Sequence, residues 1–156
     1  MADVATSTDD FPGFARTIEP RLRSALVAAL GQERGSEATA EALAWAWEHR
    51  DRAVALEHPV GYLFKVGRSR TRLRRLRRPV FDPVPNGELP HVEPGLPAAL
   101  ASLSERQRVA VVLVHGYGWD RREVAGLLDI GVSTLDSHLA RGLLKLRRAL
   151  GASSDG

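Results

Sequence analysis

Residues 120–150, DRREVAGLLDIGVSTLDSHLARGLLKLRRAL, decide the fold of this chain. A short helix is expected first, then a turn at 129–131, then a second helix that follows Ser133. The small Ala125 allows the two helices to cross closely, and Ile130 is expected to fill the turn against the core. This order predicts a helix-turn-helix, in which the second helix lies in the DNA major groove with its first residues at the base edges.

The predicted second helix carries two kinds of side chain with different expected roles. Polar groups near its start would read base edges and give sequence specificity, whereas basic groups farther along would contact phosphates and give affinity alone. The alternative interpretation is a plain helical hairpin whose apolar stripe serves only the core. The expected DNA-contact residues of this segment are Arg121, Arg122, Ser133, Thr134, Asp136, Ser137, His138, Arg141, Lys145, Arg147 and Arg148.

Capping signals mark the starts of helices in this half of the chain. A Ser or Asp followed three residues later by an acidic or amide side chain occurs at 104–107, 120–123 and 133–136, which is the pattern of a capping box. We expect the first of these helices to end near His115 and the last to end at Gly151.

A proline-rich, acidic stretch precedes this half. Six prolines lie between residues 79 and 97. Because each proline fixes its backbone and lacks an N–H, neither a helix nor a central strand is expected there. We therefore predict a domain at 1–78, an extended acidic linker at 79–95, a second domain at 96–151 and a tail at 152–156.

The N-terminal half is also predicted to be helical. An apolar stripe runs over 14–31, with a kink or a new helix start at Pro20. An alanine-rich helix is expected over 36–51 with Ser36 as its N-cap, and a third helix begins at Pro59. Strand signals are absent, so the predicted fold class is all-α with two small helical domains. The apolar positions of the third helix are Tyr62, Leu63, Val66, Leu73 and Leu76.

The basic residues are concentrated in one block. Residues 58–79 hold eight bases and no acid, within a chain whose net charge is only +3 and whose pI is 9.9. A run of one sign repels itself, so an anionic partner such as a nucleic acid is expected, with a solvated helix face as the alternative. Nearly all the bases are arginine, and the Ala- and Arg-rich composition suggests a GC-rich bacterial genome.

Other kinds of site are not indicated. The absence of cysteine excludes disulfides and thiolate zinc sites, and the five histidines show no metal-ligand spacing. No phosphate-binding loop or nucleophile motif is present, so we expect no enzyme activity, metal or cofactor. The start of the chain is acidic and polar, unlike a secretory signal, and no apolar run approaches the roughly 18 residues that span a bilayer. We therefore expect a cytoplasmic protein without a membrane partner.

The C-terminal half resembles region four of the extracytoplasmic-function sigma factors, the smallest members of the main bacterial sigma class. The resemblance is carried by 99–109, by Glu123-Val124-Ala125 with Leu128, and by STLDSHLARG at 133–142. In that family this region binds the minus-thirty-five promoter element and the flap of RNA polymerase. The composition makes the chain similar to actinobacterial members of the family.

The N-terminal half resembles region two of the same family. EATAEAL at 37–43 matches the acidic helix that docks on the polymerase clamp, and YLFKVGRS at 62–69 matches the segment that opens and holds the minus-ten element. The first match implies polymerase contacts by Glu37, Glu41, Leu43 and Trp47. The second implies DNA contacts by Lys65, Arg68, Ser69, Arg70, Arg72, Arg74 and Arg75.

Several positions depart from the family pattern. Ala40 replaces the usual glutamine of the clamp helix, and Ser69 and Arg72 replace an asparagine and an aspartate of region two. On the recognition helix, Asp136 and His138 replace a lysine and an arginine. These departures make promoter melting a weaker expectation than DNA binding.

The resemblance implies a sigma-like initiation factor that binds core RNA polymerase and directs it to promoters. Its candidate partners are promoter DNA, core RNA polymerase and an anti-sigma protein. Two other functions fit the same sequence. One is a helix-turn-helix regulator that no longer melts promoters, and the other is a module that binds only polymerase or an anti-sigma protein.

Overall fold

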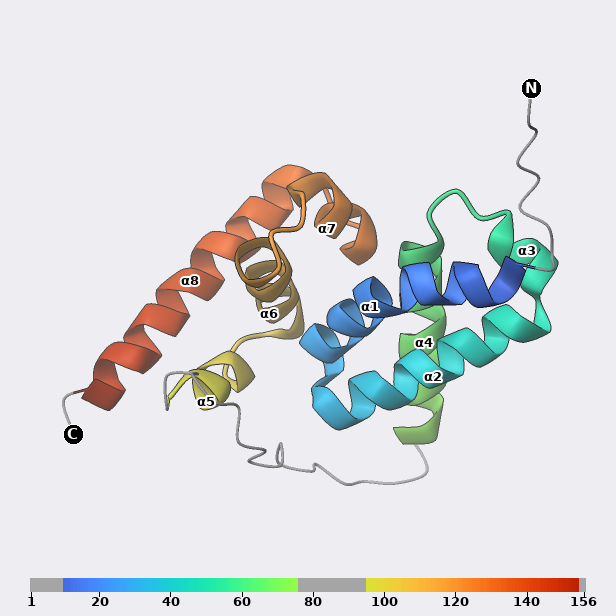
Figure 1. The fold of residues 1–156 in the computed structure, drawn as a ribbon. Helices are drawn as coiled ribbons and strands as arrows, with labels where there is room; N and C mark the ends of the chain where they lie inside the picture. Colours follow the sequence, from blue (N-terminus) through green and yellow to red (C-terminus); the bar gives the residue numbers. More distant parts are fainter. Residues whose placement is uncertain (1–9, 76–94, 155–156) are drawn as a thin grey trace. The chain divides into compact units, whose positions relative to one another are not determined.

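The computed structural model describes residues 10–75 and 95–154, apart from the side chains at 74, 75 and 152–154. Every regular element in these ranges is helical (Figure 1), which confirms the all-α prediction. The helices form two compact units, one before and one after residues 76–94, and each has its own core. The predicted linker at 79–95 lies outside the described residues except for Gly95.

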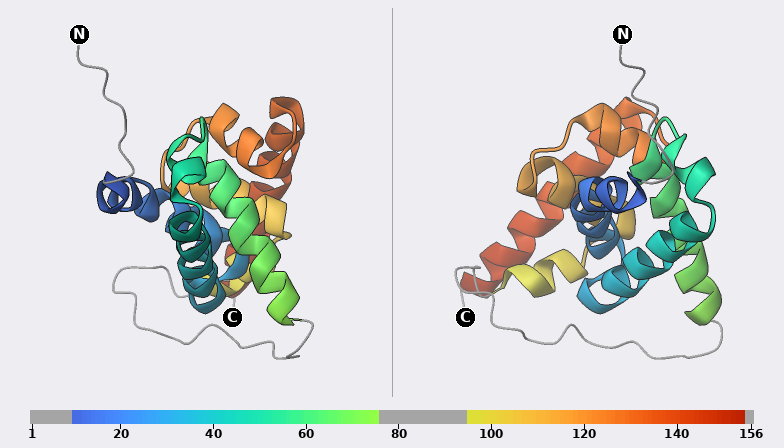
Figure 2. Two further views of the ribbon diagram at one scale, coloured as in Figure 1. Left: turned by 90° about the vertical axis from the view of Figure 1, so that its right-hand side faces the viewer. Right: turned by 45° about the vertical axis from the view of Figure 1, so that its right-hand side comes forward.

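The N-terminal unit is built on three long helices and one short one. They are α1 (Phe11–Leu30), α2 (Gln32–Glu48), α3 (Arg50–Val54) and α4 (Pro59–Arg75). The three long helices pack against one another, and Figures 1 and 2 show α4 crossing both α1 and α2. Their largest fully buried side chains are Leu22, Leu26, Leu63 and Phe64.

Helix α1 continues through Pro20 as one helix. Of the two predicted effects of Pro20, the structure therefore has a bend and no new helix start. An interior proline lacks the N–H that the helix needs and its ring crowds the preceding turn, which bends a helix without always ending it. Figure 1 shows α1 changing direction near its middle. The helix ends at Gly31, whose φ of 91° lies in the left-handed region that favours glycine.

Helix α2 begins at Gln32, so the prediction of a start at Ser36 is wrong. The cause is a tertiary contact that the local capping signal does not contain. A Cβ on Gly35 would lie 2.5 Å from the Val27 Cα, so α1 and α2 cross here with their backbones in contact. The N–H of Gly35 donates to the Gly31 carbonyl (2.8 Å), which closes the first turn of α2 well before Ser36.

The predicted end of this helix, at residue 51, is also wrong. Helix α2 ends at Glu48, and α3 is a separate short helix that the alanine-rich pattern did not reveal. His49 lies between them with φ −119° and ψ 38°, outside helical geometry. The sequence carries no glycine or proline at this point, so nothing local signalled the break.

Helix α4 starts at Pro59 as predicted, but it buries a different face from the one expected. Leu63 is fully buried, whereas Leu73 is 64% exposed, and Phe64, absent from the predicted apolar set, is fully buried. Gly67 lies one helical turn after Leu63 and is also buried. A Cβ added to Gly67 would meet the Ala38 carbonyl oxygen at 2.7 Å. Close approach of α4 to α2 therefore depends on small residues, which an apolar periodicity does not count. The predicted Leu76 lies outside the described residues.

The C-terminal unit contains α5 (Leu96–Ala101), α6 (Glu105–Val111), a π-helical turn η2 (Val112–Gly116), α7 (Arg121–Leu128) and α8 (Val132–Ser154). Its core is formed by fully buried side chains from three of these helices and from η2: Val109, Leu113, Val124 and Leu135. Helix α8 packs against α5, α6 and α7, so it runs the length of the unit.

The capping box predicted at 104–107 is present. The Gln107 N–H donates to the Ser104 Oγ (3.2 Å), and the Ser104 N–H donates to the Gln107 Oε1 (3.2 Å). Helix α6 and η2 together carry the chain to Gly116, close to the predicted end near His115. Local side-chain chemistry is sufficient to define this helix start.

Helix α8 continues past Gly151 to Ser154, so the predicted end of this helix at Gly151 is wrong. The only described glycines with positive φ are Gly31 and Gly118, so Gly151 does not act as a left-handed cap. Glycine in a helix costs only about 1 kcal/mol relative to alanine, which the neighbouring turns can absorb. Over the residues that the structure describes, none of the helices is long and apolar enough to cross a bilayer.

Candidate nucleic-acid and protein interfaces

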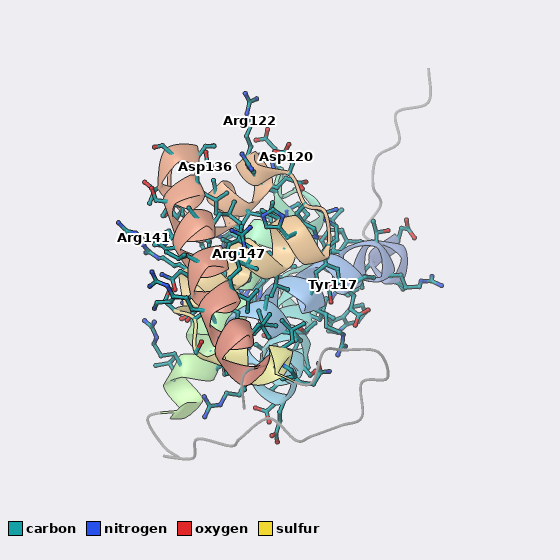
Figure 3. The ribbon with its side chains drawn as sticks, turned by 90° about the vertical axis from the view of Figure 1, so that its left-hand side faces the viewer. Tyr117, Asp120, Arg122, Asp136, Arg141 and Arg147 are labelled. Atoms are coloured by element: carbon teal, nitrogen blue, oxygen red, sulfur yellow. The ribbon has the colours of Figure 1, made fainter. Side chains whose placement is uncertain are left out.

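Asp120 caps the first turn of α7, as its position in the sequence predicted. Its backbone is extended (φ −64°, ψ 140°), and its carboxylate accepts a hydrogen bond from the Arg122 N–H at 2.8 Å. An acidic cap satisfies an open N–H and complements the positive end of the helix dipole. Arg121 and Arg122 consequently leave the first turn of α7 as exposed side chains, and Figure 3 shows Arg122 projecting from the unit.

The turn predicted at 129–131 joins α7 to α8. Asp129 is in the left-handed conformation (φ 59°, ψ 43°), which aspartate tolerates better than most residues. The N–H of Ile130 donates to the Ala125 carbonyl (3.0 Å), and Ala125 is 3% exposed where α7 packs on α8. The helix-turn-helix predicted from the sequence is therefore present.

Helix α8 begins at Val132, so the prediction of a capping box at Ser133 and Asp136 is wrong. The N–H of Leu135 donates to the Gly131 carbonyl (3.0 Å), which closes the first turn ahead of Ser133. Ser133 is thus within the helix, and its carbonyl accepts a hydrogen bond from the Ser137 Oγ at 3.2 Å.

The start of α8 presents a polar surface. Ser133, Thr134, Asp136 and Ser137 are exposed, and His138 is half-buried. Four of the five expected base-reading side chains are therefore available to a ligand on this face. His138 lies closer to the packed side of the helix.

One ion pair links the two helices of the motif. Arg121 Nη1 lies 3.4 Å from Asp136 Oδ1, with the side chains 56% and 48% exposed. A single exposed pair of this kind contributes little to folding stability. Its consequence is geometric, because it ties a side chain at the start of α7 to one at the start of α8.

Basic side chains follow the polar ones along α8. Arg141, Lys145, Arg147 and Arg148 are all exposed, and Figure 3 shows Arg141 and Arg147 projecting from the helix beyond Asp136. This order, polar groups first and cations afterwards, is the one expected of a recognition helix that reads bases at its start and binds phosphates along its length.

Arg108 differs from these exposed arginines. It is half-buried, its Nη1 donates to the Leu103 carbonyl (3.3 Å), and desolvation lowers its pKa, while the charge of Glu105 acts in the opposite direction. Arg108 therefore supports the packing of α6 against the preceding turn.

On α2, the four expected polymerase contacts form two pairs. Glu37 is exposed and Glu41 half-buried, one helical turn apart; Leu43 is half-buried and Trp47 is 54% exposed, also one turn apart. Helical spacing places exposed Ala40 between these two pairs, on the side of α2 opposite the buried Ala42 and Ala46.

Glu41 also pairs with a residue expected to bind DNA. Arg70 Nη1 on α4 lies 3.5 Å from Glu41 Oε2 on α2. Arg68 extends over the Phe64 ring, with its guanidinium carbon 5.5 Å from the ring centroid. Two of the arginines in the basic block therefore contact the protein itself.

The remaining expected DNA contacts on α4 face solvent where their side chains are described. Lys65, Ser69 and Arg72 are exposed on α4. Arg74 and Arg75 continue the helix, although their side chains lie outside the described residues. The block is thus divided between helix packing and a solvent-facing cationic strip.

An aromatic cluster on α2, α3 and α4 was not predicted. The ring centroids of Trp45 and His49 are 4.5 Å apart in a stacked arrangement, and Tyr62 lies 5.2 Å from Trp45. Arg52 extends over the Trp45 ring at 5.7 Å and donates from Nη2 to the Tyr62 hydroxyl (3.0 Å). The sequence pattern that could have indicated this cluster is the spacing of four residues between Trp45 and His49, which places the two rings on one side of a helix.

Trp47 forms a second aromatic contact at the other side of α2. Its ring packs edge-on against Phe11 at 5.2 Å, and the Arg50 guanidinium carbon lies 5.0 Å from its ring centroid. More than half of the side chain remains exposed. An exposed tryptophan held by a neighbouring ring is a typical anchor for a protein partner.

In the described part of the chain, no three His, Asp or Glu residues lie close enough together to hold a metal ion. The expected contact residues lie on three surfaces of the described structure. These surfaces are the helix-turn-helix of α7 and α8, the solvent-facing side of α2, and the cationic strip of α4.

Residues 95–146 match the family described as sigma-70, region 4. Comparison with curated proteins gives no match. Among solved structures, the fold is similar to that of the sigma factor RpoE from Bartonella quintana, which was crystallised with the anti-sigma factor NepR. The two chains are 21% identical with a TM-score of 0.66, over 91% of this chain and 97% of the Bartonella protein. Residues 95–146 are therefore similar to sigma-70 region 4, and the chain has the helical fold seen in the Bartonella sigma factor.

Proposed function

We propose that this chain is a sigma-type transcription initiation factor of the extracytoplasmic-function class. It binds core RNA polymerase and directs it to particular promoters. The observation that carries the proposal is the helix-turn-helix of α7 and the first part of α8, which lies within the region 4 match at 95–146 and presents polar groups before basic ones.

In this function the helix-turn-helix reads the upstream promoter element. Ser133, Thr134, Asp136, Ser137 and His138 lie toward the base edges, and Arg121, Arg122, Arg141, Lys145, Arg147 and Arg148 toward the phosphates. The exposure of all but His138 supports this assignment. Phosphate contacts fix the position of the helix, and base contacts provide the choice of sequence.

The N-terminal unit serves polymerase and the melted region. Leu43 and Trp47 supply the apolar anchor on the solvent-facing side of α2, and Glu37 and Glu41 supply acidic contacts beside it. Lys65, Ser69 and Arg72 are exposed on α4, and these residues, together with Arg74 and Arg75, would bind a nucleic acid. We propose domain boundaries at 1–78 and 96–151 with the linker at 79–95 between them.

A second function is favoured by the region-two departures. Ser69 and Arg72 replace an amide and a carboxylate. This unit would therefore bind DNA by electrostatic attraction to the backbone, with little base recognition. A regulator that binds DNA and polymerase without melting promoters would have this chemistry. The two functions differ in one respect, which is whether transcripts start.

The partner of the solved sigma factor suggests a further regulator. Because the Bartonella protein was crystallised with an anti-sigma factor, we propose that a protein of that class also binds this chain. The composition, with alanine and arginine abundant and lysine limited to Lys65 and Lys145, supports an actinobacterial-type origin. A cytoplasmic location and the absence of catalytic activity follow from a sigma-factor role.

Two assays separate these functions. Duplex binding by the full chain, measured at several salt concentrations, should weaken steeply as salt rises, because cationic side chains displace counterions from DNA. A salt-independent or absent response would leave only a protein-interaction module. Run-off transcription with core RNA polymerase then separates an initiation factor from a regulator that cannot melt promoters.

A further inference from the structure

Asp136 is the single acidic side chain in the first ten residues of α8, VSTLDSHLAR at 132–141. Its side chain is 48% exposed and lies at the same end of the unit as Asp120 and Arg122 (Figure 3). A carboxylate on a DNA-binding helix is repelled by phosphates, so it weakens non-specific binding. When the helix is bound to duplex DNA, the Asp136 carboxylate is therefore expected to accept a hydrogen bond from a base and to avoid the phosphate backbone.

An ion pair between the two helices of the motif contacts this carboxylate. Asp120 caps α7 through the Arg122 N–H (2.8 Å), which defines the first turn that carries Arg121. Arg121 then holds Asp136 at 3.4 Å through Oδ1. A carboxylate offers about four lone-pair positions, so one guanidinium contact leaves acceptors for a base.

The hydroxyl groups beside Asp136 are less able to choose a base. Ser137 donates its Oγ hydrogen to the Ser133 carbonyl (3.2 Å), so that hydrogen is used within the helix. The hydroxyls of Ser133 and Thr134 can donate or accept, so they fit several base edges. A carboxylate can only accept, and the donors in the major groove are the amino groups of cytosine and adenine.

We propose that Asp136 reads the N4 amino group of one cytosine in the major groove of the bound promoter, and that Arg121 is the residue that positions it. Acidic side chains pair with cytosine N4, whereas adenine is favoured by the paired donor and acceptor of an amide. The inference rests on the proposed function, because it names the base that the helix-turn-helix selects.

The test is selection of binding sites from a randomised duplex DNA library by the full chain, alone and with core RNA polymerase. The wild type should select cytosine at one position, roughly tenfold over the other bases. Asp136→Ala should reduce that preference to less than about twofold, and Asp136→Asn should shift it to adenine. Arg121→Ala should weaken the preference for cytosine at the same position.

Asp129→Asn provides the matched control. It removes the same charge from the same unit, and asparagine tolerates the left-handed backbone of Asp129. This variant should select the wild-type site. Uniformly tighter binding by Asp136→Ala with every base preference retained would show simple repulsion and overturn the assignment. A wild type that selects no sequence in either form would instead overturn the proposed function, and the assignment with it.

Discussion

The arginines of this chain have different roles according to their burial. Arg108 is half-buried and donates to a backbone carbonyl, and desolvation lowers its pKa. Arg70 pairs with Glu41 across two helices. Arg147, in contrast, is exposed on α8 beyond the polar start of the helix. Composition alone does not distinguish these cases, because burial and pairing depend on which helices pack together.

Arg147→Ala should weaken binding to every duplex by a similar factor and reduce the salt slope of binding by about one unit, because one phosphate contact is lost. Arg106→Ala is the control, since Arg106 is exposed on α6, outside the helix-turn-helix. Titrations of the full chain at several salt concentrations measure both effects. An unchanged salt slope in Arg147→Ala would remove Arg147 from the phosphate contacts.

The helices were predictable where their signals are local. The Ser104 capping box, the Asp120 cap and the turn at 129–131 are each defined by a few neighbouring residues, and the structure contains all three. The start of α2 and the buried face of α4 were not predictable in this way. They depend on Gly35 and Gly67, where backbones meet between helices, and a local capping or apolar pattern does not contain contacts between two helices.

The two glycines of α4 provide a matched test of this close packing. Gly67→Ala should destabilise the chain by about 1–3 kcal/mol, because the new Cβ would meet the Ala38 carbonyl oxygen at 2.7 Å. Gly61→Ala lies in the same helix with nothing within 4 Å of its Cβ, so it should stabilise the chain by about 0.5–1 kcal/mol. Urea unfolding measures both changes. Equal effects at the two positions would show that α4 does not depend on close contact with α2.

Helix α2 also carries the predicted polymerase surface. Leu43→Glu places a charge beside Trp47 on the solvent-facing side of the helix, so it should abolish co-purification with core RNA polymerase while duplex binding is retained. Leu73→Glu is the control, because Leu73 is an exposed leucine on α4 (64%). Retained polymerase binding by a folded Leu43→Glu variant would assign the docking surface elsewhere.

Across the whole molecule, the surfaces expected to bind DNA and RNA polymerase differ in charge. Residues 58–79 carry eight bases and no acid, while α2 presents Glu37 and Glu41 beside an apolar pair. The family resemblance indicated which partner each surface serves. The division of the basic block was visible only in the structure, where Arg68 and Arg70 contact the protein and Lys65, Ser69 and Arg72 are exposed.

The exposed part of the block predicts how the melted region is held. Cationic groups attract the backbone of any sequence, so single substitutions across the minus-ten element should change transcription by similar, small factors that depend on salt. The measurement is a scan of all single substitutions with the wild-type factor. One position whose substitution reduces output about a hundredfold would reveal a specific base pocket and contradict an electrostatic grip.

Run-off transcription tests the central claim most directly. Core RNA polymerase, with and without the full chain, is given a duplex that carries a site selected by this protein, and the 5′ ends of transcripts are mapped. We expect transcripts from one start downstream of the site only when the chain is present, and loss of these transcripts with Leu43→Glu. A chain that binds both the duplex and the polymerase but yields no transcript would contradict an initiation factor and indicate a regulator without promoter-melting activity.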